Sequence, residues 1–137
     1  METHADLTDK EFETQFKNCA LSPDQFNHEA HLRLAWIHIR QYGTGQAIEN
    51  ICNQLNNFTR HAGAADKYNV TLTIASIKAV AHFIKKTDTA NFNDFIMQVP
   101  RLKYDFKELM ACHYSQDIYN ADIARKEFIE PDLLPFE

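Results

Sequence analysis

The sequence predicts an all-α protein of about six helices, and two observations carry this prediction. Apolar residues recur at helical spacing through most of the chain, and no segment alternates regularly enough to be a strand. The chain contains only three glycines and four prolines, which argues against long loops. With 45% hydrophobic and 24% charged residues, residues 1–137 are expected to form a single helical domain.

The first helix follows a capping box. In the stretch TDKE at positions 8–11, the side chains of Thr8 and Glu11 each accept a hydrogen bond from the other residue's backbone N–H. We expect residues 1–7 to be frayed and the turn LSPDQ at 21–25 to end the helix. Three residues at helical spacing form its inward face: Phe12, Phe16 and Cys19.

Glycines and caps delimit the next three helices. The second is expected over residues 27–42 and ends at Gly43, and the third over residues 44–62 and ends at Gly63. A polar link leads to a fourth helix over residues 71–86. One side of the third helix is polar and is expected to face water: Glu49, Asn50, Asn53, Asn57 and Arg60.

The last third of the chain is predicted to be less regular. A short segment over residues 91–98 precedes Pro100, and a further helix is expected to reach His113. A last short helix, capped by Ser115 or Asn120, is expected to extend through residue 128. Residues 130–137 are predicted to be an extended tail docked on the bundle through Leu133, Leu134 and Phe136.

Composition excludes several classes of partner. The net charge of −5 and the lack of a basic cluster beyond Lys85–Lys86 argue against nucleic acid. No apolar run approaches the roughly 18 residues that a membrane span needs, and the polar, acidic start is no secretory signal. The odd number of distant cysteines fits a reducing cytoplasm, where we expect the protein: Cys19, Cys52 and Cys112. The sequence does not indicate an oligomeric state.

Histidines cluster on one side of the second helix. Because an α-helix turns about 100° per residue, His28, His31, Ala35, His38 and Tyr42 form one stripe within the apolar arc. The charged residues of the same helix lie on the other side: Glu29, Arg33 and Arg40. His113 continues the apolar stripe of its own helix and also points inward, whereas His61 and His82 are expected to be solvated: both lie at polar helix faces.

Inward histidines need partners, because burying an imidazole without a hydrogen bond costs a few kcal/mol. His28 and His31, one turn apart, can converge on one ligand, with His113 as the best third group. That set favours a divalent transition metal such as zinc or iron, although HEAH at 28–31 lacks the HExxH spacing of zinc proteases. Acid–base catalysis without metal is a second interpretation. In a third, the histidines are structural and the protein is a ligand-binding or protein-interaction module.

Three stretches together carry a resemblance: FNHEAHLRLAW at 26–36, KYNVTLT at 67–73, and the end of the chain from 113 to 135. They resemble a family of small bacterial all-helical proteins without an assigned activity, which share the pattern F-x-H-x-x-H-L-x-x-A-W. The family's middle motif has a histidine where this chain has Asn69. The resemblance therefore implies a weaker metal site here, or a hydrogen-bonding role for the amide.

The resemblance also implies which parts of the chain meet. The beginnings of the second and fourth helices and the turn after His113 are expected to surround one cavity that takes a small-molecule ligand. Its predicted residues are His28, His31, Tyr68, Asn69, His113 and Ser115, with His38 and Tyr42 as further lining residues. A metal-binding or acid–base small-molecule enzyme is favoured by a narrow margin over a binding module, and the sequence leaves open whether the protein is an enzyme.

Overall fold

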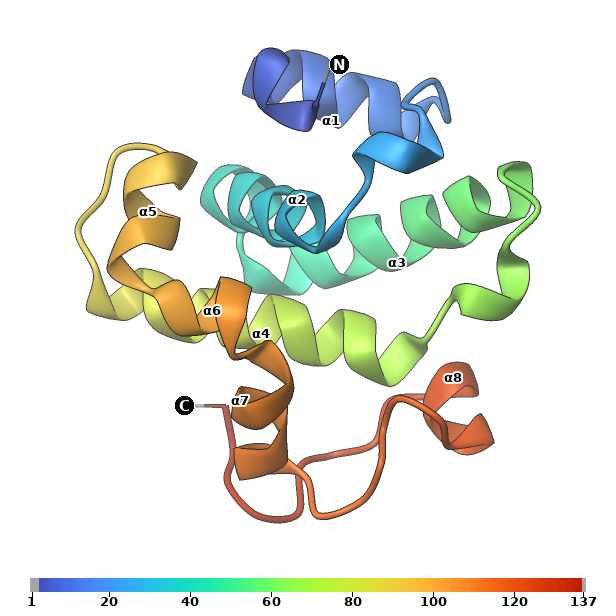
Figure 1. Ribbon diagram of the computed structural model, residues 1–137, viewed down its shortest axis with the longest axis vertical. Coiled ribbons are helices and arrows are strands. Elements are labelled where there is room, and N and C mark those ends of the chain that lie inside the picture. Colours follow the sequence, from blue (N-terminus) through green and yellow to red (C-terminus); the bar gives the residue numbers. More distant parts are fainter. Residues whose placement is uncertain (1–2, 137) are drawn as a thin grey trace. The chain divides into compact units, whose positions relative to one another are not determined.

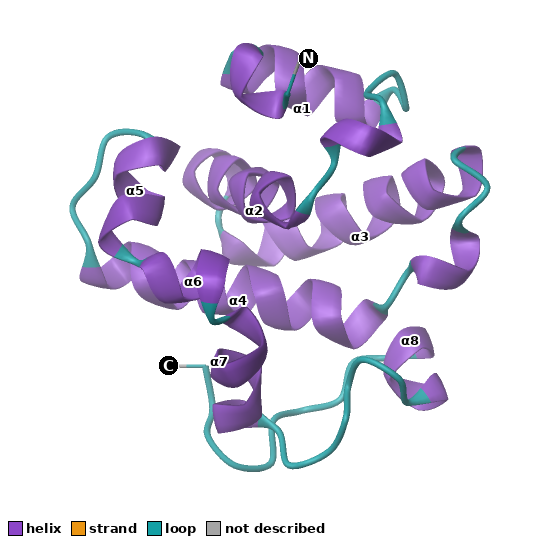
Figure 2. Ribbon diagram, viewed as in Figure 1, coloured by secondary structure: helices purple, strands orange, loops and turns teal. Residues whose placement is uncertain are grey.

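The prediction of an all-α fold is confirmed by a computed structural model that describes residues 3–136. This part of the chain contains eight α-helices and three short 3₁₀ helices, and it contains no strand (Figures 1 and 2). The α-helices are α1 (Asp9–Lys17), α2 (His28–Tyr42), α3 (Thr44–His61), α4 (Val70–Lys86), α5 (Phe92–Gln98), α6 (Pro100–Tyr104), α7 (Phe106–His113) and α8 (Asp122–Lys126). The 3₁₀ helices are η1 (His4–Asp6), η2 (Pro23–Gln25) and η3 (Ala65–Lys67).

The chain divides into two compact units, Met1–Tyr68 and Asn69–Glu137. Helices α1 to α3 belong to the first unit, and helices α4 to α8 belong to the second. Within the described residues, none of these helices combines the length and the apolar character that crossing a membrane requires.

Local signals account for the helices of the first unit. At the start of α1 the predicted capping box is present, with Glu11 N–H donating to Thr8 Oγ1 (3.1 Å) and Thr8 N–H donating to Glu11 Oε1 (2.9 Å). Asn27 caps α2 through its Oδ1, which accepts from the N–H of Ala30 at 2.9 Å. Gly43, at φ 87°, ends α2 and directly precedes α3, so a single residue reverses the chain. As a result α2 and α3 pack against each other in antiparallel directions.

The prediction of a frayed amino terminus is wrong for residues 3–7; residues 1 and 2 lie outside the described part. Residues 4–6 form η1, and the side chain of His4 is buried. Arg33 of α2 holds this segment in place, because its guanidinium is buried rather than solvated. It donates to the carbonyl oxygens of His4 (2.5 Å) and Leu7 (2.8 Å), and a buried guanidinium requires such acceptors.

The second unit has more helices than predicted, which raises the total from about six to eight. Helix α4 begins one residue early, at Val70, because Asn69 is its cap. The single helix expected to reach His113 is divided into α6 and α7, because Asp105 leaves helical geometry at φ −126° and ψ 33°. Pro100 occupies the first turn of α6, where its missing N–H is not needed.

The carboxy-terminal tail is not helical after α8, and it is held mainly by its backbone. Leu133 N–H donates to the carbonyl of His113 (3.0 Å), and the Phe136 ring stacks on the His113 ring at a centroid distance of 4.0 Å. The side chains of Leu133 and Leu134 are 57% and 53% exposed. The prediction that these leucines dock is therefore wrong, and only Phe136 contributes an apolar contact of the expected kind.

Candidate functional site

The residues predicted to form one cavity are distributed over the two units. His28, His31, His38, Tyr42 and Tyr68 belong to the first unit, whereas Asn69, His113 and Ser115 belong to the second. A cavity shared by both groups stays a prediction. The hydrogen bonds, burial and charge of each residue are therefore described within its own unit.

His31 is the most perturbed histidine of the first unit. Its ring lies 4.0 Å from the ring of Phe26, measured between centroids, and Phe26 in turn packs on Phe16 (4.7 Å) and Phe58 (5.2 Å). Protein atoms surround the imidazole closely even though part of its edge remains exposed. This burial, with a smaller contribution from His28, lowers the pKa of His31 to about 4. His31 is therefore a neutral imidazole at physiological pH.

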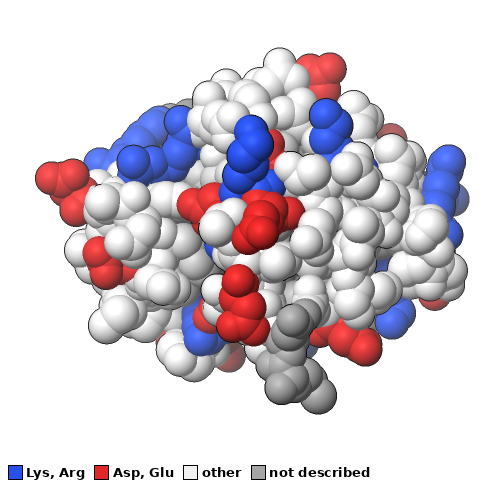
Figure 3. Space-filling model, turned by 90° about the horizontal axis from the view of Figure 1, so that it is seen from above, with Lys and Arg blue, Asp and Glu red and all other residues white. Residues whose placement is uncertain are grey.

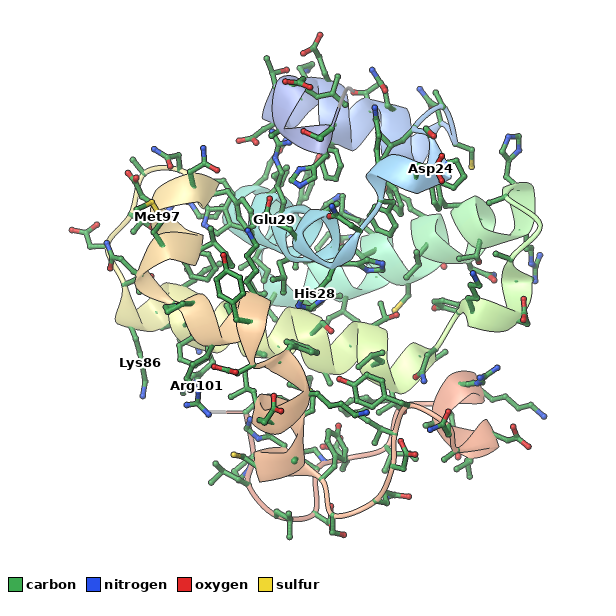
Figure 4. All side chains as sticks on the ribbon, viewed as in Figure 1. Asp24, His28, Glu29, Lys86, Met97 and Arg101 are labelled. Carbon is green, nitrogen blue, oxygen red and sulfur yellow. The ribbon has the colours of Figure 1, made fainter. Side chains whose placement is uncertain are left out.

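His28 is exposed, so the prediction that it points inward is wrong. It is the first residue of α2, directly after the cap Asn27, and Figure 4 shows it at the start of the helix. A residue in this position has no preceding helical turn beneath it, so helical periodicity alone does not determine its burial. The imidazole of His28 is therefore exposed, and that of His31, one turn later, is half-buried.

His38 is fully buried, as predicted, and burial lowers its pKa, opposed by the negative charge of Glu13. Tyr42 is 41% exposed, so its predicted inward position is wrong. It is the last residue of α2, where its hydroxyl reaches α1 and donates to Glu13 Oε2 at 2.6 Å. This hydrogen bond raises the pKa of Tyr42.

Two polar residues of α3 are half-buried although the sequence did not predict it, and one of them, Asn50, lies beside His38. Asn50, which was expected to face water, is half-buried, and its Nδ2 lies 3.5 Å from His38 Nδ1. Gln54 follows one turn later, and its Oε1 is buried. A sequence signal for them exists, because Gln46, Asn50 and Gln54 recur every four residues along the border of the apolar face of α3.

Tyr68 is half-buried at the end of the first unit, and its hydroxyl forms a hydrogen bond with the thiol of Cys52. Burial is the main cause that raises the pKa of Tyr68, and burial likewise raises the pKa of Cys52. A thiol held in its protonated form is a poor nucleophile. This pair is therefore suited to packing and hydrogen bonding and not to covalent catalysis.

Asn69 has a structural role that occupies both atoms of its amide. Its Oδ1 accepts from the N–H of Leu72 (2.9 Å) and caps α4, and its Nδ2 donates to the carbonyl of Ile118 (2.8 Å). The residue is buried, and both polar atoms of its amide have partners within the second unit. These bonds account for an asparagine at this position without a bound ligand.

His113 and Ser115 hold the carboxy-terminal tail. His113 is buried, as predicted, and its Nδ1 donates to the carbonyl of Leu134 at 2.6 Å. Ser115 is exposed; its N–H donates to Asp132 Oδ1 (3.0 Å) and its hydroxyl donates to Asp132 Oδ2. These two hydrogen bonds lower the pKa of Asp132. Of the predicted second-unit candidates, His113 and Ser115 thus bind the chain's own tail.

The donor set does not fit the metal predicted from the sequence. Within residues 3–136, no group of three or more His, Cys, Asp or Glu side chains is arranged to hold a metal ion. His28 and His31 alone provide two nitrogen ligands, fewer than the three protein ligands of a catalytic zinc site or the four of a structural one.

Charged side chains do not mark a site on the face shown in Figure 3. On the face shown in Figure 3, acidic and basic groups are interspersed, and neither sign forms a continuous stripe there. Comparison of the chain with protein-family models, curated proteins and solved structures found no match. The resemblance to a bacterial family therefore stays a prediction, and the functional argument rests on the residues themselves.

Proposed function

We propose that this protein binds a small organic molecule at a surface formed by Phe26, His28 and His31 around the first turn of α2. The observation that supports the proposal is the neutral, half-buried imidazole of His31 in contact with an aromatic ring. A neutral imidazole offers one hydrogen-bond donor and one acceptor. Phe26 adds a flat apolar surface, and together they suit a ligand with an uncharged polar group on an aromatic body.

Binding is favoured over acid–base catalysis by the proton affinity of His31. A general base works best when its pKa lies near the working pH, and a pKa of about 4 makes His31 a weak one. Metal catalysis is not proposed, because the described donor set is too small. In this proposal His31 recognises the ligand, and the exposed His28 provides a second polar contact at the rim.

The proposal is tested with defined probes and the intact protein. We expect phenol to produce saturable shifts of the His31 imidazole and Phe26 ring signals in NMR spectra, because its hydroxyl can bond to a neutral imidazole. Benzoate should bind more weakly, because its carboxylate would be partly desolvated and the neutral His31 provides no positive charge to offset this. The variant His31→Phe keeps an aromatic ring but removes the hydrogen bond, and its remaining probe, the Phe26 ring signal, should no longer shift with phenol.

The matched control is His61→Phe, which changes an exposed histidine at the end of α3 and should respond like the wild type. A wild-type protein that shows no saturable shift with phenol would contradict the proposal. An unchanged shift of the Phe26 ring signal with phenol in His31→Phe would also contradict it. Saturable binding of Zn²⁺ alone to both histidines would favour the metal interpretation instead.

A further inference from the structure

The carboxy-terminal tail after Ile129 returns from α8 to the end of α7 within the second unit (Figure 1). His113 binds the tail backbone twice: its carbonyl accepts from Leu133 N–H (3.0 Å), and its Nδ1 donates to the Leu134 carbonyl (2.6 Å). Every residue offers a backbone carbonyl, and every residue except proline offers an N–H. These two bonds therefore hold a peptide segment in place without selecting its side chains.

The side chain of Asp132 adds a contact that does select. Ser115 binds both oxygens of its carboxylate, with the backbone N–H donating to Oδ1 (3.0 Å) and the hydroxyl donating to Oδ2. Hydrogen bonds to an ionised acceptor are about twice as strong as those between neutral groups. Both Ser115 and Asp132 are exposed. A carboxylate is thus recognised at a position that is open to solvent.

The ring of Phe136 makes the second selective contact, four residues after Asp132. It stacks on the His113 imidazole at 4.0 Å between centroids and an interplanar angle of 25°, and it lies 6.2 Å from the Tyr114 ring. Only a planar ring can reproduce this stacking. The turn formed by residues 113–115 therefore contacts an aspartate and an aromatic residue at a fixed spacing.

The tail is held by these contacts and not by a buried apolar core. The two leucines between the selective contacts are 57% and 53% exposed. Hydrogen bonds at exposed positions exchange with bonds to water and contribute little net stability. Ile129 is anchored separately, because its N–H donates to Thr71 Oγ1 (3.0 Å) and its carbonyl accepts from the Tyr114 hydroxyl (2.7 Å). The residues after Ile129 can therefore leave the turn while this anchor stays in place.

We infer that the turn His113–Ser115 is a binding site for a peptide segment of another protein, in which an aspartate is followed four residues later by an aromatic residue. The chain's own residues 132–136 have this pattern and occupy the site in the absence of the partner. The partner segment replaces the tail contact for contact: its aspartate binds Ser115, and its ring stacks on His113. The site belongs to the second unit and uses none of the residues of the proposed ligand surface.

A second copy of this chain is a poor competitor for the site. Its tail is identical, but it lacks the effective concentration, in the millimolar range, that a short tether gives to the chain's own tail. A different protein can compete by making further contacts at the two positions between the aspartate and the aromatic residue, where the leucines of the tail remain largely exposed.

The test uses the full-length chain and a synthetic peptide with the sequence of residues 130–137, EPDLLPFE. We expect the variant Asp132→Ala, whose own tail is weakened, to bind the peptide with saturable shifts of the His113 and Ser115 amide signals in NMR spectra. The wild type should bind it at least roughly tenfold more weakly, because the tethered tail competes. Phe136→Ala weakens the tail at its other selective contact and should behave like Asp132→Ala.

Changes in the peptide test the pattern, with Asp132→Ala as the receiving protein. Peptides that carry Asp132→Ala or Phe136→Ala should bind at least roughly tenfold more weakly than the parent peptide, because each loses one selective contact. A peptide that carries both Leu133→Ser and Leu134→Ser should keep the affinity of the parent within about threefold, since the leucine side chains are largely exposed.

The matched control is the protein variant Asp88→Ala, which removes a different exposed carboxylate of the second unit and should bind the peptide as weakly as the wild type. Absence of peptide binding by both tail variants would overturn the inference, and so would equal binding of the parent and Asp132→Ala peptides. Dimerisation of the wild type in analytical ultracentrifugation that both tail variants abolish would also overturn it, because a second copy would then occupy the site.

Discussion

Asn69 is a single residue that links the first turn of α4 to the segment around Ile118 within the second unit. Its Oδ1 caps α4 at the N–H of Leu72, its Nδ2 binds the carbonyl of Ile118, and its own carbonyl accepts from the N–H of Thr73. Because the side chain is buried, water cannot replace these bonds after a substitution. Asn69 therefore contributes to stability whether or not it also lies near a ligand.

A graded series at this position tests that role. Asn69→Ala should lower the free energy of unfolding by about 2 kcal/mol, because it removes the cap and leaves the Ile118 carbonyl unpaired. Asn69→Ser can still cap α4 and should lose less than the alanine variant. Urea denaturation of both variants measures the difference. Equal stability of Asn69→Ala and the wild type would contradict this account.

His31 and His38 differ at the residue scale although both lie on one stripe of α2. The pKa of each is lowered mainly by burial. His31 keeps a partly exposed edge beside Phe26, whereas His38 is closed off completely and contacts Asn50. Of the two, only His31 is therefore open to a ligand, and His38 is a buried residue of the packed α2–α3 pair.

At the scale of elements, the attachment of the amino-terminal segment to α2 depends on Arg33. Every N–H group of its guanidinium has an acceptor: Nε and Nη2 donate to Asp9 Oδ1, Nη2 also donates to the carbonyl of Leu7, and Nη1 is directed at the carbonyl and Nδ1 of His4. The guanidinium also lies 4.9 Å from the centroid of the Phe12 ring. Residues 4–9 thus close around one buried cation.

Replacing this arginine should release the segment while leaving α2 helical. Arg33→Lys keeps the charge, but an ammonium group has three donors on one nitrogen and cannot reach all of these acceptors. We expect the free energy of unfolding to fall by about 2–3 kcal/mol and amide hydrogens of residues 4–8 to exchange faster. Hydrogen-exchange mass spectrometry measures the second effect.

The matched control is Arg60→Lys, which alters an exposed arginine near the end of α3. It should leave the hydrogen exchange of residues 4–8 unchanged. Its free energy of unfolding should differ from the wild type by no more than about 0.5 kcal/mol. Unchanged exchange in Arg33→Lys would show that other contacts hold the segment.

At the scale of the whole molecule, buried histidines make stability depend on pH. Burial lowers the pKa values of His31, His38 and His82 in the folded protein below the value of about 6.5 for an unfolded histidine. His82, which was expected to be solvated, is half-buried. The unfolded chain therefore binds more protons than the folded protein at mildly acidic pH. The stabilisation is complete above about pH 6.5 and is lost as the pH falls towards the folded pKa values.

For His31 alone, the pKa is about 6.5 in the unfolded chain and about 4 in the folded protein. This difference lowers the free energy of unfolding by roughly 3 kcal/mol when the pH falls to 4. We expect the free energy of unfolding, measured by urea denaturation, to fall between pH 6.5 and pH 4.5. His31→Phe should show a smaller decrease over this interval, because the titrating group is gone. The exposed-site control His61→Phe should keep the wild-type dependence. An identical pH dependence in His31→Phe would contradict the account.

The sequence by itself determined the helical class and most helix boundaries. The capping box at Thr8 and the stop at Gly43 were both predicted, and both act between residues no more than four positions apart. Helical periodicity also located the buried His38 and His113. Such features are readable because the interactions that cause them are local. The division of the 100–113 region at Asp105 was missed because its apolar stripe continues across the break.

Only the tertiary structure decided which polar side chains are buried and what they bind. Arg33 was assigned to the solvent side of α2, but acceptors 24 to 29 residues earlier in the chain bury it. His28 and Tyr42, at the two ends of α2, are exposed because no neighbouring helical turn covers them. Two buried atoms without a hydrogen-bond partner among the described residues, His38 Nε2 and Gln54 Oε1, are visible only once α2 and α3 are packed together. The burial of a polar group depends on partners distant in sequence, and helical periodicity carries no information about them.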